Sequence, residues 1–196
     1  MPVVEAAQIL ALEAELALER ERCRRLEAQL RNLADHDPLT DLLNRRSFER
    51  ELEEHVAGCT RYGPEGALLL VGLDGVDDVA CALGQWATDE AVAGVAQRVV
   101  GRLRETDVVG RWGPAELAVL LPRASPSEVV VVADALVGIV GRTETPRVPP
   151  GALLASIGVV LVVATPVEAA GLLRRAAEAS DAARRAGGGR WLLAEG

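Results

Sequence analysis

The seven residues RWGPAEL (111–117) stand between two runs that are typical of β-strands, TDVVG and LAVLLP. Gly and Pro at the centre of such a segment favour a tight turn, so the sequence predicts a β-hairpin here. A hairpin tip can present side chains to a ligand. This turn, however, carries a single charged side chain, Glu116. The residues raise the question of whether the tip is a working site or the remnant of one.

Histidine and cysteine, the usual ligands of zinc and other transition metals, are sparse in the chain. The histidines are His36 and His55, and the cysteines Cys23, Cys59 and Cys81 lie far apart without a Cys-x-x-Cys spacing. The sequence therefore predicts no bound metal and no cofactor. Scattered cysteines in odd number are typical of a reducing compartment, and no signal peptide is recognisable, so we expect a cytoplasmic protein.

Composition limits the partners that the chain can have. It has 196 residues, a net charge of -8 and 49% hydrophobic residues, enough for one domain with a core and a short extra segment. An acidic chain lacks the positive field that attracts nucleic acid and anionic membranes, so we expect neither as a partner. Every basic residue is Arg. A Lys-to-Arg change at a site therefore carries little information.

Residues 3–34 have a helical pattern that the remainder lacks. Apolar residues recur at alternating spacings of three and four, with Glu19 as an acidic interruption, and the segment contains no Gly or Pro. A lone helix with so narrow an apolar stripe is marginal in water, so it needs a partner. We expect residues 1–34 to form a coiled-coil helix that makes a homodimer. A helix folded back on its own domain is the alternative, and Cys23 in the seam leaves the oligomer number open.

Residues 35–196 alternate between helical and strand-like patterns. Helices are expected over residues 42–61 and about 85–104, in SPSEVVVVADALVGIV with Ser127 as N-cap, and in PVEAAGLLRRAAEASDAARRA. Strands are expected in GALLLVGLD (66–74), in both arms of the hairpin, in GALLASIGVVLVV and in RWLLAE. One antiparallel hairpin interrupts the alternation. The pattern thus predicts an α+β fold with a central mixed sheet flanked by helices.

From residue 36 to its end the chain resembles the GGDEF domains of diguanylate cyclases, which condense two GTP molecules into cyclic di-GMP. The stretches that carry the resemblance are DPLTDLLNRRSF, LLLVGLDGVDDVACALG, RETDVVGRWGPAELAVLLP, SIGVV and RRAAEASDAARRAG. They occur in the family's order and at its spacings. The resemblance implies the family's nucleotidyl-cyclase-like fold. GGDEF domains also often follow a dimerising coiled coil, which agrees with the pattern of residues 3–34.

The resemblance identifies the hairpin as the family's signature turn, in which Gly-Gly-Asp-Glu-Phe has become GPAEL (113–117). In the family, magnesium is held by a carboxylate at the end of the first core strand and by another at the third signature position. These positions correspond to Gly72 and Ala115, which carry no side-chain oxygen, whereas Mg²⁺ takes hard oxygen ligands. Pro114 lacks the N–H of the glycine that it replaces.

Other positions also lack the nucleotide-contacting residues that the resemblance implies. Ala80 stands where the resemblance implies an Asn that reads guanine, and Asp77 stands where it implies a Lys that faces phosphate. Gly113 and Glu116 keep their signature residues, and Glu116 or Asp74 could hold an ion only weakly. We therefore expect a degenerate GGDEF domain with no catalytic residues, a protein that is not an enzyme.

One family motif is intact. In RETD, Asp107 lies six residues before Gly113 and Arg104 three residues before Asp107, where the resemblance implies the RxxD site of product inhibition. Guanine offers O6 and N7 as acceptors to a guanidinium fork, and N1–H and N2–H as donors to a carboxylate. Two residues three apart at a helix end can project the same way. The alternative is an ordinary ion pair on an exposed helix end.

A further Arg that the family often adds from the next helix corresponds to Ala135, so Arg111, Arg102 or a partner subunit would have to replace it. Taken together, the sequence predicts a catalytically inactive, dimeric receptor for cyclic di-GMP in signal transduction, with an unidentified downstream protein partner. One alternative is an interaction module that assembles without nucleotide. The other is a weak cyclase.

Overall fold

The computed structural model describes residues 18–22, 35–162 and 168–194. Contacts within the chain divide it into two units, Met1–His36 and Asp37–Gly196. In the first unit, residues 18–22 are helical and Arg22 Nη1 lies 3.7 Å from Glu19 Oε1. The rest of the coiled coil expected over residues 3–34 lies outside the described residues.

A six-stranded mixed sheet forms the centre of the second unit, with the strand order β1-β3-β4-β2-β5-β6. Its strands are β1 (Leu43–Asn44), β2 (Ala67–Asp74), β3 (Val108–Gly113), β4 (Glu116–Leu121), β5 (Leu154–Leu161) and β6 (Arg190–Leu193). β2 runs antiparallel to β4 and β5, β3 and β4 form the hairpin, and the edge strands β1 and β6 run parallel to β3 and β5. The predicted α+β fold with a mixed sheet is confirmed.

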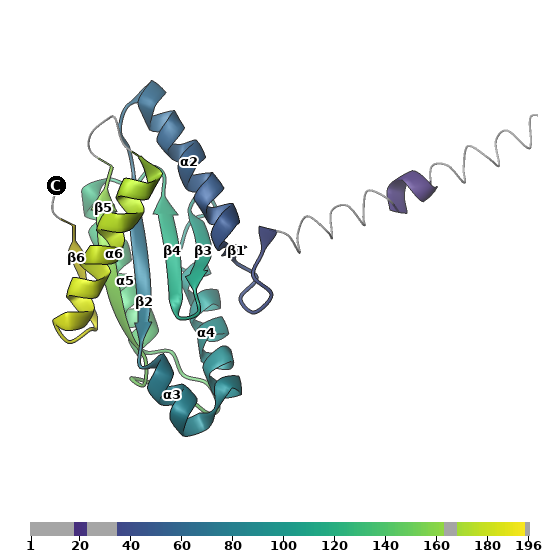
Figure 1. The fold of residues 1–196 in the computed structure, drawn as a ribbon, viewed down its shortest axis with the longest axis vertical. Helices are drawn as coiled ribbons and strands as arrows, with labels where there is room; N and C mark the ends of the chain where they lie inside the picture. The colour runs from purple at the N-terminus through teal and green to yellow at the C-terminus, as the bar shows by residue number, and fades with distance from the viewer. Residues whose placement is uncertain (1–17, 23–34, 163–167, 195–196) are drawn as a thin grey trace, which may run out of the picture. The chain divides into compact units, whose positions relative to one another are not determined.

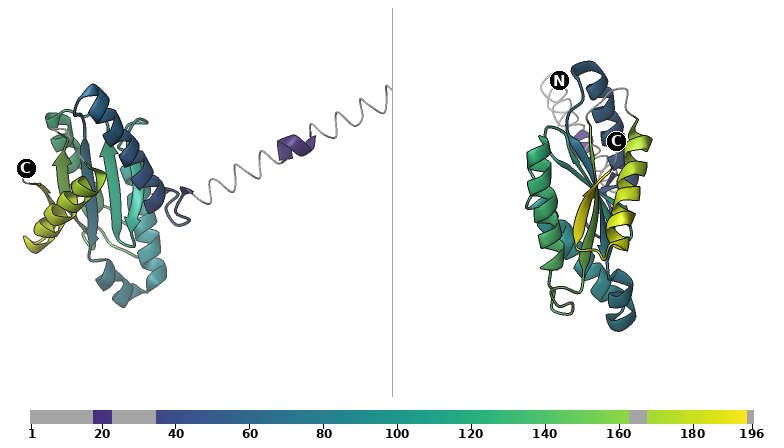
Figure 2. Two further views of the ribbon diagram at one scale, coloured as in Figure 1. Left: turned by 45° about the horizontal axis from the view of Figure 1, so that its top comes forward. Right: turned by 90° about the vertical axis from the view of Figure 1, so that its left-hand side faces the viewer.

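Helices cover both faces of this sheet (Figures 1 and 2). α2 (Arg45–Tyr62) and α6 (Ala169–Arg185) pack on one face, and α4 (Gln85–Val100) and α5 (Pro126–Gly141) on the other. Because both faces are covered, β2 is buried along nearly its whole length and reads as one apolar run rather than an alternating one. Among the described helices, none is both long and apolar enough to cross a membrane.

The helices differ from the sequence prediction before and after α4. α3 (Val76–Leu83) was missed, because an eight-residue helix between Gly75 and Gly84 is too short to show a clear period. Both glycines have positive φ, 89° and 84°, which favours Gly at the two ends of this helix. α4 ends at Val100, so Arg104 lies in the following turn and not at a helix end.

The start of α5 also differs from the prediction. Its N-cap is Ser125 rather than Ser127, and Pro126 is the first helical residue. Ser125 Oγ accepts a hydrogen bond from the backbone N–H of Glu128, and Glu128 Oε2 accepts one from the backbone N–H of Ser125 at 2.9 Å. This reciprocal capping box fixes the position of the Glu128 carboxylate.

Candidate functional site

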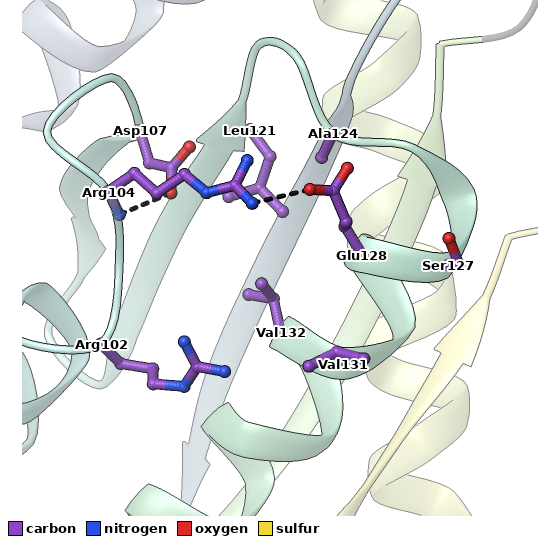
Figure 3. Close-up of a pocket in the computed structure, with 9 residues that line it drawn as sticks. All are labelled: Arg102, Arg104, Asp107, Leu121, Ala124, Ser127, Glu128, Val131 and Val132. Carbon is purple, nitrogen blue, oxygen red and sulfur yellow. Dashed lines mark hydrogen bonds and ion pairs between the residues drawn. The ribbon is translucent and has the colours of Figure 1, made fainter.

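Arg104 and Asp107 lie in the turn that connects α4 to β3 (Figure 3). Asp107 Oδ2 accepts a hydrogen bond from the backbone N–H of Arg104 at 2.8 Å, and the Asp107 backbone N–H donates to the Arg104 carbonyl at 3.0 Å. The turn is therefore closed by the Asp107 carboxylate and by one backbone hydrogen bond between the two residues. The guanidinium of Arg104 is left to reach another element.

A pocket of about 260 Å³ separates this turn from the first turns of α5. Its lining residues are Arg102, Arg104, Asp107, Leu121, Ala124, Ser127, Glu128, Val131 and Val132. The aliphatic side chains offer a flat apolar surface, while the charged groups stand around it. A pocket of this composition suits a planar ring with hydrogen-bonding edges.

Glu128 faces Arg104 across the pocket. Arg104 Nη2 lies 2.6 Å from Glu128 Oε1, and the two side chains are 64% and 42% exposed. Hydrogen bonds from the Ser125 backbone, from Arg104 and from the Ser125 hydroxyl lower the pKa of Glu128 to about 2. The carboxylate is therefore charged at neutral pH. Glu128 was not predicted as a site residue, although Ser-x-x-Glu at 125–128 is the sequence signal of a capping box and fixes where this carboxylate lies.

The three candidates for a second arginine have different positions. Arg102 lines the pocket and extends from the same side as Arg104 (Figure 3). Arg111 is held elsewhere, because its Nη1 donates to both carboxylate oxygens of Asp37, at 2.9 and 3.1 Å, and its Nη2 donates to the Pro114 carbonyl. Ala135, on α5, carries no group that could bind a ligand.

The positions that depart from the family lie around a second cleft, of about 520 Å³. Its lining residues are Leu73, Asp74, Gly75, Val76, Asp77, Asp78, Pro114, Ala115, Glu116 and Arg184. The structure thus brings Asp77 together with the hairpin residues 114–116. Gly72 pairs with Glu116 in the β2–β4 register, and Gly113 ends β3, so both lie beside the cleft. Ala80, in α3, is not among the lining residues.

Arg184 covers the position where the resemblance implies a metal-binding carboxylate. Its Nε donates to Asp74 Oδ1 at 2.6 Å, and Ser156 Oγ donates to the other oxygen of Asp74. A Cβ atom on Gly72 would collide with Nη2 of Arg184. The hydrogen bond with Asp74 raises the pKa of the Arg184 guanidinium. A positive group therefore occupies the space that a side chain at residue 72 would need.

The donor groups of this cleft do not fit the magnesium ion that the family implies. Gly72 and Ala115 supply no side-chain oxygen, and both oxygens of Asp74 already accept hydrogen bonds. Across the described part of the chain, no three His, Cys, Asp or Glu side chains gather where they could hold a metal ion. Because Mg²⁺ needs several oxygen ligands, we derive no metal-dependent step from this arrangement.

Comparisons with known proteins show which family this fold belongs to. The family model "Diguanylate cyclase, GGDEF domain" matches residues 34–190. Diguanylate cyclase TpbB of Pseudomonas aeruginosa is 33% identical over 190 residues, which cover 94% of this chain and 43% of TpbB. The chain thus spans less than half the length of this curated relative.

Two solved structures are similar over nearly the whole chain. The coiled coil and GGDEF domain of DgcB from Caulobacter crescentus, in complex with cyclic di-GMP, matches with a TM-score of 0.83 and 28% identity, over 93% of this chain and 99% of that one. Diguanylate cyclase SiaD of Pseudomonas aeruginosa, in complex with its activator SiaC, matches with a TM-score of 0.78 and 26% identity, over 97% of this chain and 73% of that one.

These findings correct one prediction. We expected a protein that is not an enzyme, but the matching family is a family of diguanylate cyclases and the curated relative is named as one. The absence of side-chain oxygens at Gly72 and Ala115 is a property of the cleft. It does not place the chain outside a family of enzymes. This chain belongs to the GGDEF domain family of diguanylate cyclases.

Proposed function

We propose that this chain binds cyclic di-GMP in the pocket between the Arg104–Asp107 turn and α5, and that it acts in signal transduction through this binding. The observation that carries the proposal is that Arg102, Arg104 and Asp107 line one pocket with an apolar surface. The similar structure of DgcB, determined in complex with cyclic di-GMP, supports the class of ligand.

Each lining group has a role that its chemistry suggests. The guanidinium of Arg104 presents paired N–H donors to O6 and N7 of a guanine. Asp107 uses Oδ2 for the turn, which leaves Oδ1 to accept from guanine N1–H and N2–H. Arg102 supplies a second cation to a ligand with two phosphate groups. The side chains of Val131 and Val132 offer apolar contact to a base.

Calorimetric titration of the full chain with cyclic di-GMP tests the proposal. Arg104→Ala removes charge-assisted hydrogen bonds and should weaken binding roughly tenfold or more. Asp107→Asn keeps an acceptor for the turn but loses the charge, and should weaken binding by a similar factor. Arg102→Ala should have a smaller effect, about threefold. Arg98→Ala is the matched control, because Arg98 is exposed in the last turn of α4 and does not line the pocket.

The outcomes separate this proposal from its alternative. No heat from the wild-type chain across micromolar to millimolar ligand would favour an interaction module that works without nucleotide. Binding that persists unchanged in Arg104→Ala would place the ligand at another site. Binding that is lost equally in Arg98→Ala would indicate a general charge effect.

Diguanylate cyclase activity is the second candidate function. The observation that favours it is the cleft at the hairpin end, where Asp74, Asp77 and Glu116 place carboxylates beside an arginine. The test is chromatography of the products formed from GTP and Mg²⁺. Product that disappears in Glu116→Gln would support this activity. No product from the wild type, or an equal amount from the variant, would count against it.

We also propose that residues 3–34 make the protein a homodimer, that it acts in the cytoplasm, and that a downstream protein partner reads its ligand state. The heptad-like spacing of apolar residues supports the dimer. Light scattering of the full chain should give the mass of a dimer. Leu26→Glu, in the seam, should reduce that mass to the monomer value, whereas Ala28→Glu, outside the seam, should leave it unchanged.

A further inference from the structure

The two walls of the ligand pocket are joined by one ion pair that comes from the protein itself. Arg104 lies in the turn before β3 and Glu128 in the first turn of α5, 24 residues away in the sequence. Their charged ends meet at 2.6 Å across the pocket, as the dashed line in Figure 3 shows. The carboxylate thus engages Nη2 of Arg104, a donor nitrogen that a guanine or a phosphate could otherwise contact.

The start of α5 holds Glu128 in this position. Oε2 accepts hydrogen bonds from the backbone N–H and the hydroxyl of Ser125, at 2.9 and 2.8 Å. Oε1 is the atom that contacts Arg104. One oxygen therefore serves the helix cap and the other serves the ion pair, so the carboxylate needs no other support to keep facing Arg104.

The pair is well placed to be exchanged for a ligand. More than half of the Arg104 side chain is exposed, and an exposed ion pair in water is held weakly. A ligand that carries both a guanine edge and phosphate groups offers more contacts than one carboxylate. Glu128 also adds a negative charge beside the place where an anionic ligand must enter, opposite the cations Arg102 and Arg104.

We propose that Glu128 is a built-in competitor for Arg104: its carboxylate occupies the guanidinium in the free protein, and cyclic di-GMP binds by displacing it. This inference rests on the proposed function and adds a residue that sets the affinity of the same site. Arg102 has no ion-pair partner among the interactions of the described residues. Its guanidinium can therefore contact a phosphate while Arg104 is still paired with Glu128.

The variant Glu128→Gln separates competition from helix capping. A glutamine side chain still accepts from Ser125 at the third helical position, so the capping box is kept. The charge that holds Arg104 is lost. We expect the full-length variant to bind cyclic di-GMP about two- to fivefold more tightly than the wild type, the factor that an exposed ion pair represents. Glu105→Gln is the matched control, because it removes an equal charge from the turn that carries Arg104, but Glu105 does not line the pocket.

A second probe makes the result independent of the nucleotide. Inorganic phosphate is titrated while the Nε–H signal of Arg104 is followed by nuclear magnetic resonance. The signal should respond at a lower phosphate concentration in Glu128→Gln than in the wild type. Glu105→Gln should behave like the wild type in both titrations.

The outcomes distinguish this inference from the proposed function. Equal or weaker binding of cyclic di-GMP by Glu128→Gln would overturn the competition while leaving the binding site in place. If neither the wild type nor any variant binds cyclic di-GMP, but Glu128→Gln responds at a lower phosphate concentration than the wild type, the choice of ligand is overturned and the competition is supported. A phosphate response that the substitution does not change, without any binding of cyclic di-GMP, would overturn both.

Discussion

Two arginine–carboxylate pairs lie at opposite ends of the same strands and are held in different ways. The β2–β4 register places Leu121, in the ligand pocket, opposite Ala67, and Glu116, in the hairpin-end cleft, opposite Gly72. In the cleft, Asp74 is only 17% exposed and Ser156 binds its second oxygen. In the pocket, Arg104 and Glu128 are 64% and 42% exposed, so water reaches both partners of the pair.

The difference in burial indicates which of the two ion pairs a ligand can separate. Separating the cleft pair would leave a largely buried carboxylate with one partner lost, which is costly. Separating the pocket pair returns both groups to water, where they are well solvated. The cleft pair is therefore part of the scaffold, whereas the pocket pair can be exchanged. The substitutions below test this ranking.

The largest effect is expected where α6, which carries Arg184, meets the sheet. At Gly158 of β5, an added Cβ would lie 2.5 Å from the backbone N of Ser180 and would also collide with the carbonyl oxygen of Ala176. Because backbone cannot move aside as a side chain can, Gly158→Ala should lower the free energy of unfolding by roughly 3 kcal/mol. Urea unfolding followed by circular dichroism measures this.

The control for this substitution lies on the same helix. Gly171 of α6 has open space around its Cα, so Gly171→Ala should leave stability unchanged or raise it by up to about 1 kcal/mol. Equal unfolding midpoints for wild type and Gly158→Ala would contradict the close approach of α6 to β5.

The next effect concerns the pair that holds the hairpin. Arg111 and Asp37 are each 18% exposed, and Arg111 also binds the carbonyls of Gly113 and Pro114. Asp37→Asn should therefore cost about 1–2 kcal/mol, below the full value for a buried pair because some water reaches it. Chemical unfolding at neutral pH measures the loss. Asp78→Asn, on the exposed side of α3, is the control and should change nothing.

The same pair predicts a pH dependence. Burial raises the pKa of Asp37, but hydrogen bonds from Arg111 and Thr40 outweigh it, so the pKa in the folded protein lies below its ordinary value of 3.8. The carboxylate contributes its stability fully above that ordinary value. The contribution is lost as the pH falls through the lower pKa of the folded state. The stability difference between wild type and Asp37→Asn should narrow below about pH 4, and a constant difference down to about pH 2 would contradict the assignment.

A smaller loss is expected from the cleft pair itself. Asp74→Asn keeps the shape but removes the charge that holds Arg184, which is 44% exposed. Because solvent screens part of the interaction, we expect a loss of about 1 kcal/mol in urea unfolding. Binding of cyclic di-GMP should be unchanged, since the ligand pocket lies at the other end of β2. A loss of binding as large as that of Arg104→Ala would show that the two regions are not independent.

The sequence was sufficient for most of the sheet because five of its six strands fall in strand-like runs, whereas β1 (Leu43–Asn44) lies within residues 42–61, which were expected to be helical. β2 is an eight-residue run, of which seven residues are buried. The hairpin of β3 and β4 contains a Gly-Pro sequence that is typical of a turn. The sequence was insufficient for α3, which is bounded by Gly75 and Gly84 and is too short for periodicity. Ser127 was expected as the N-cap although it lies inside the helix, because Ser125 and Ser127 both stand just before the apolar run, and only the hydrogen bonds with Glu128 identify Ser125 as the cap.

The features of the candidate site also divide into those that the sequence indicates and those that only the fold reveals. Arg104 and Asp107 were named from the resemblance to the family's RxxD site and were expected at a helix end, and the structure places both in the turn after α4, where they line one pocket. The contact of Arg104 with Glu128 could not be predicted, because the fold brings α5 to the turn from 24 residues away. The position of Arg184 over Gly72 depends on packing between β2 and α6, which brings Arg184 to Asp74 from 110 residues away in the sequence. Sequence spacing shows which groups are present, but not which cation meets which carboxylate.

The smallest effect on stability is expected from the ligand pocket, and it is the one that completes the comparison. Arg104→Ala removes only an exposed ion pair, so the thermal midpoint of the free protein should stay at the wild-type value. Cyclic di-GMP should raise the midpoint of the wild type, because a ligand that binds only the folded state stabilises it. It should not raise that of Arg104→Ala. A lower midpoint in the free variant would mean that the pair supports the fold as the cleft pair does, and that Arg104 is not available for exchange.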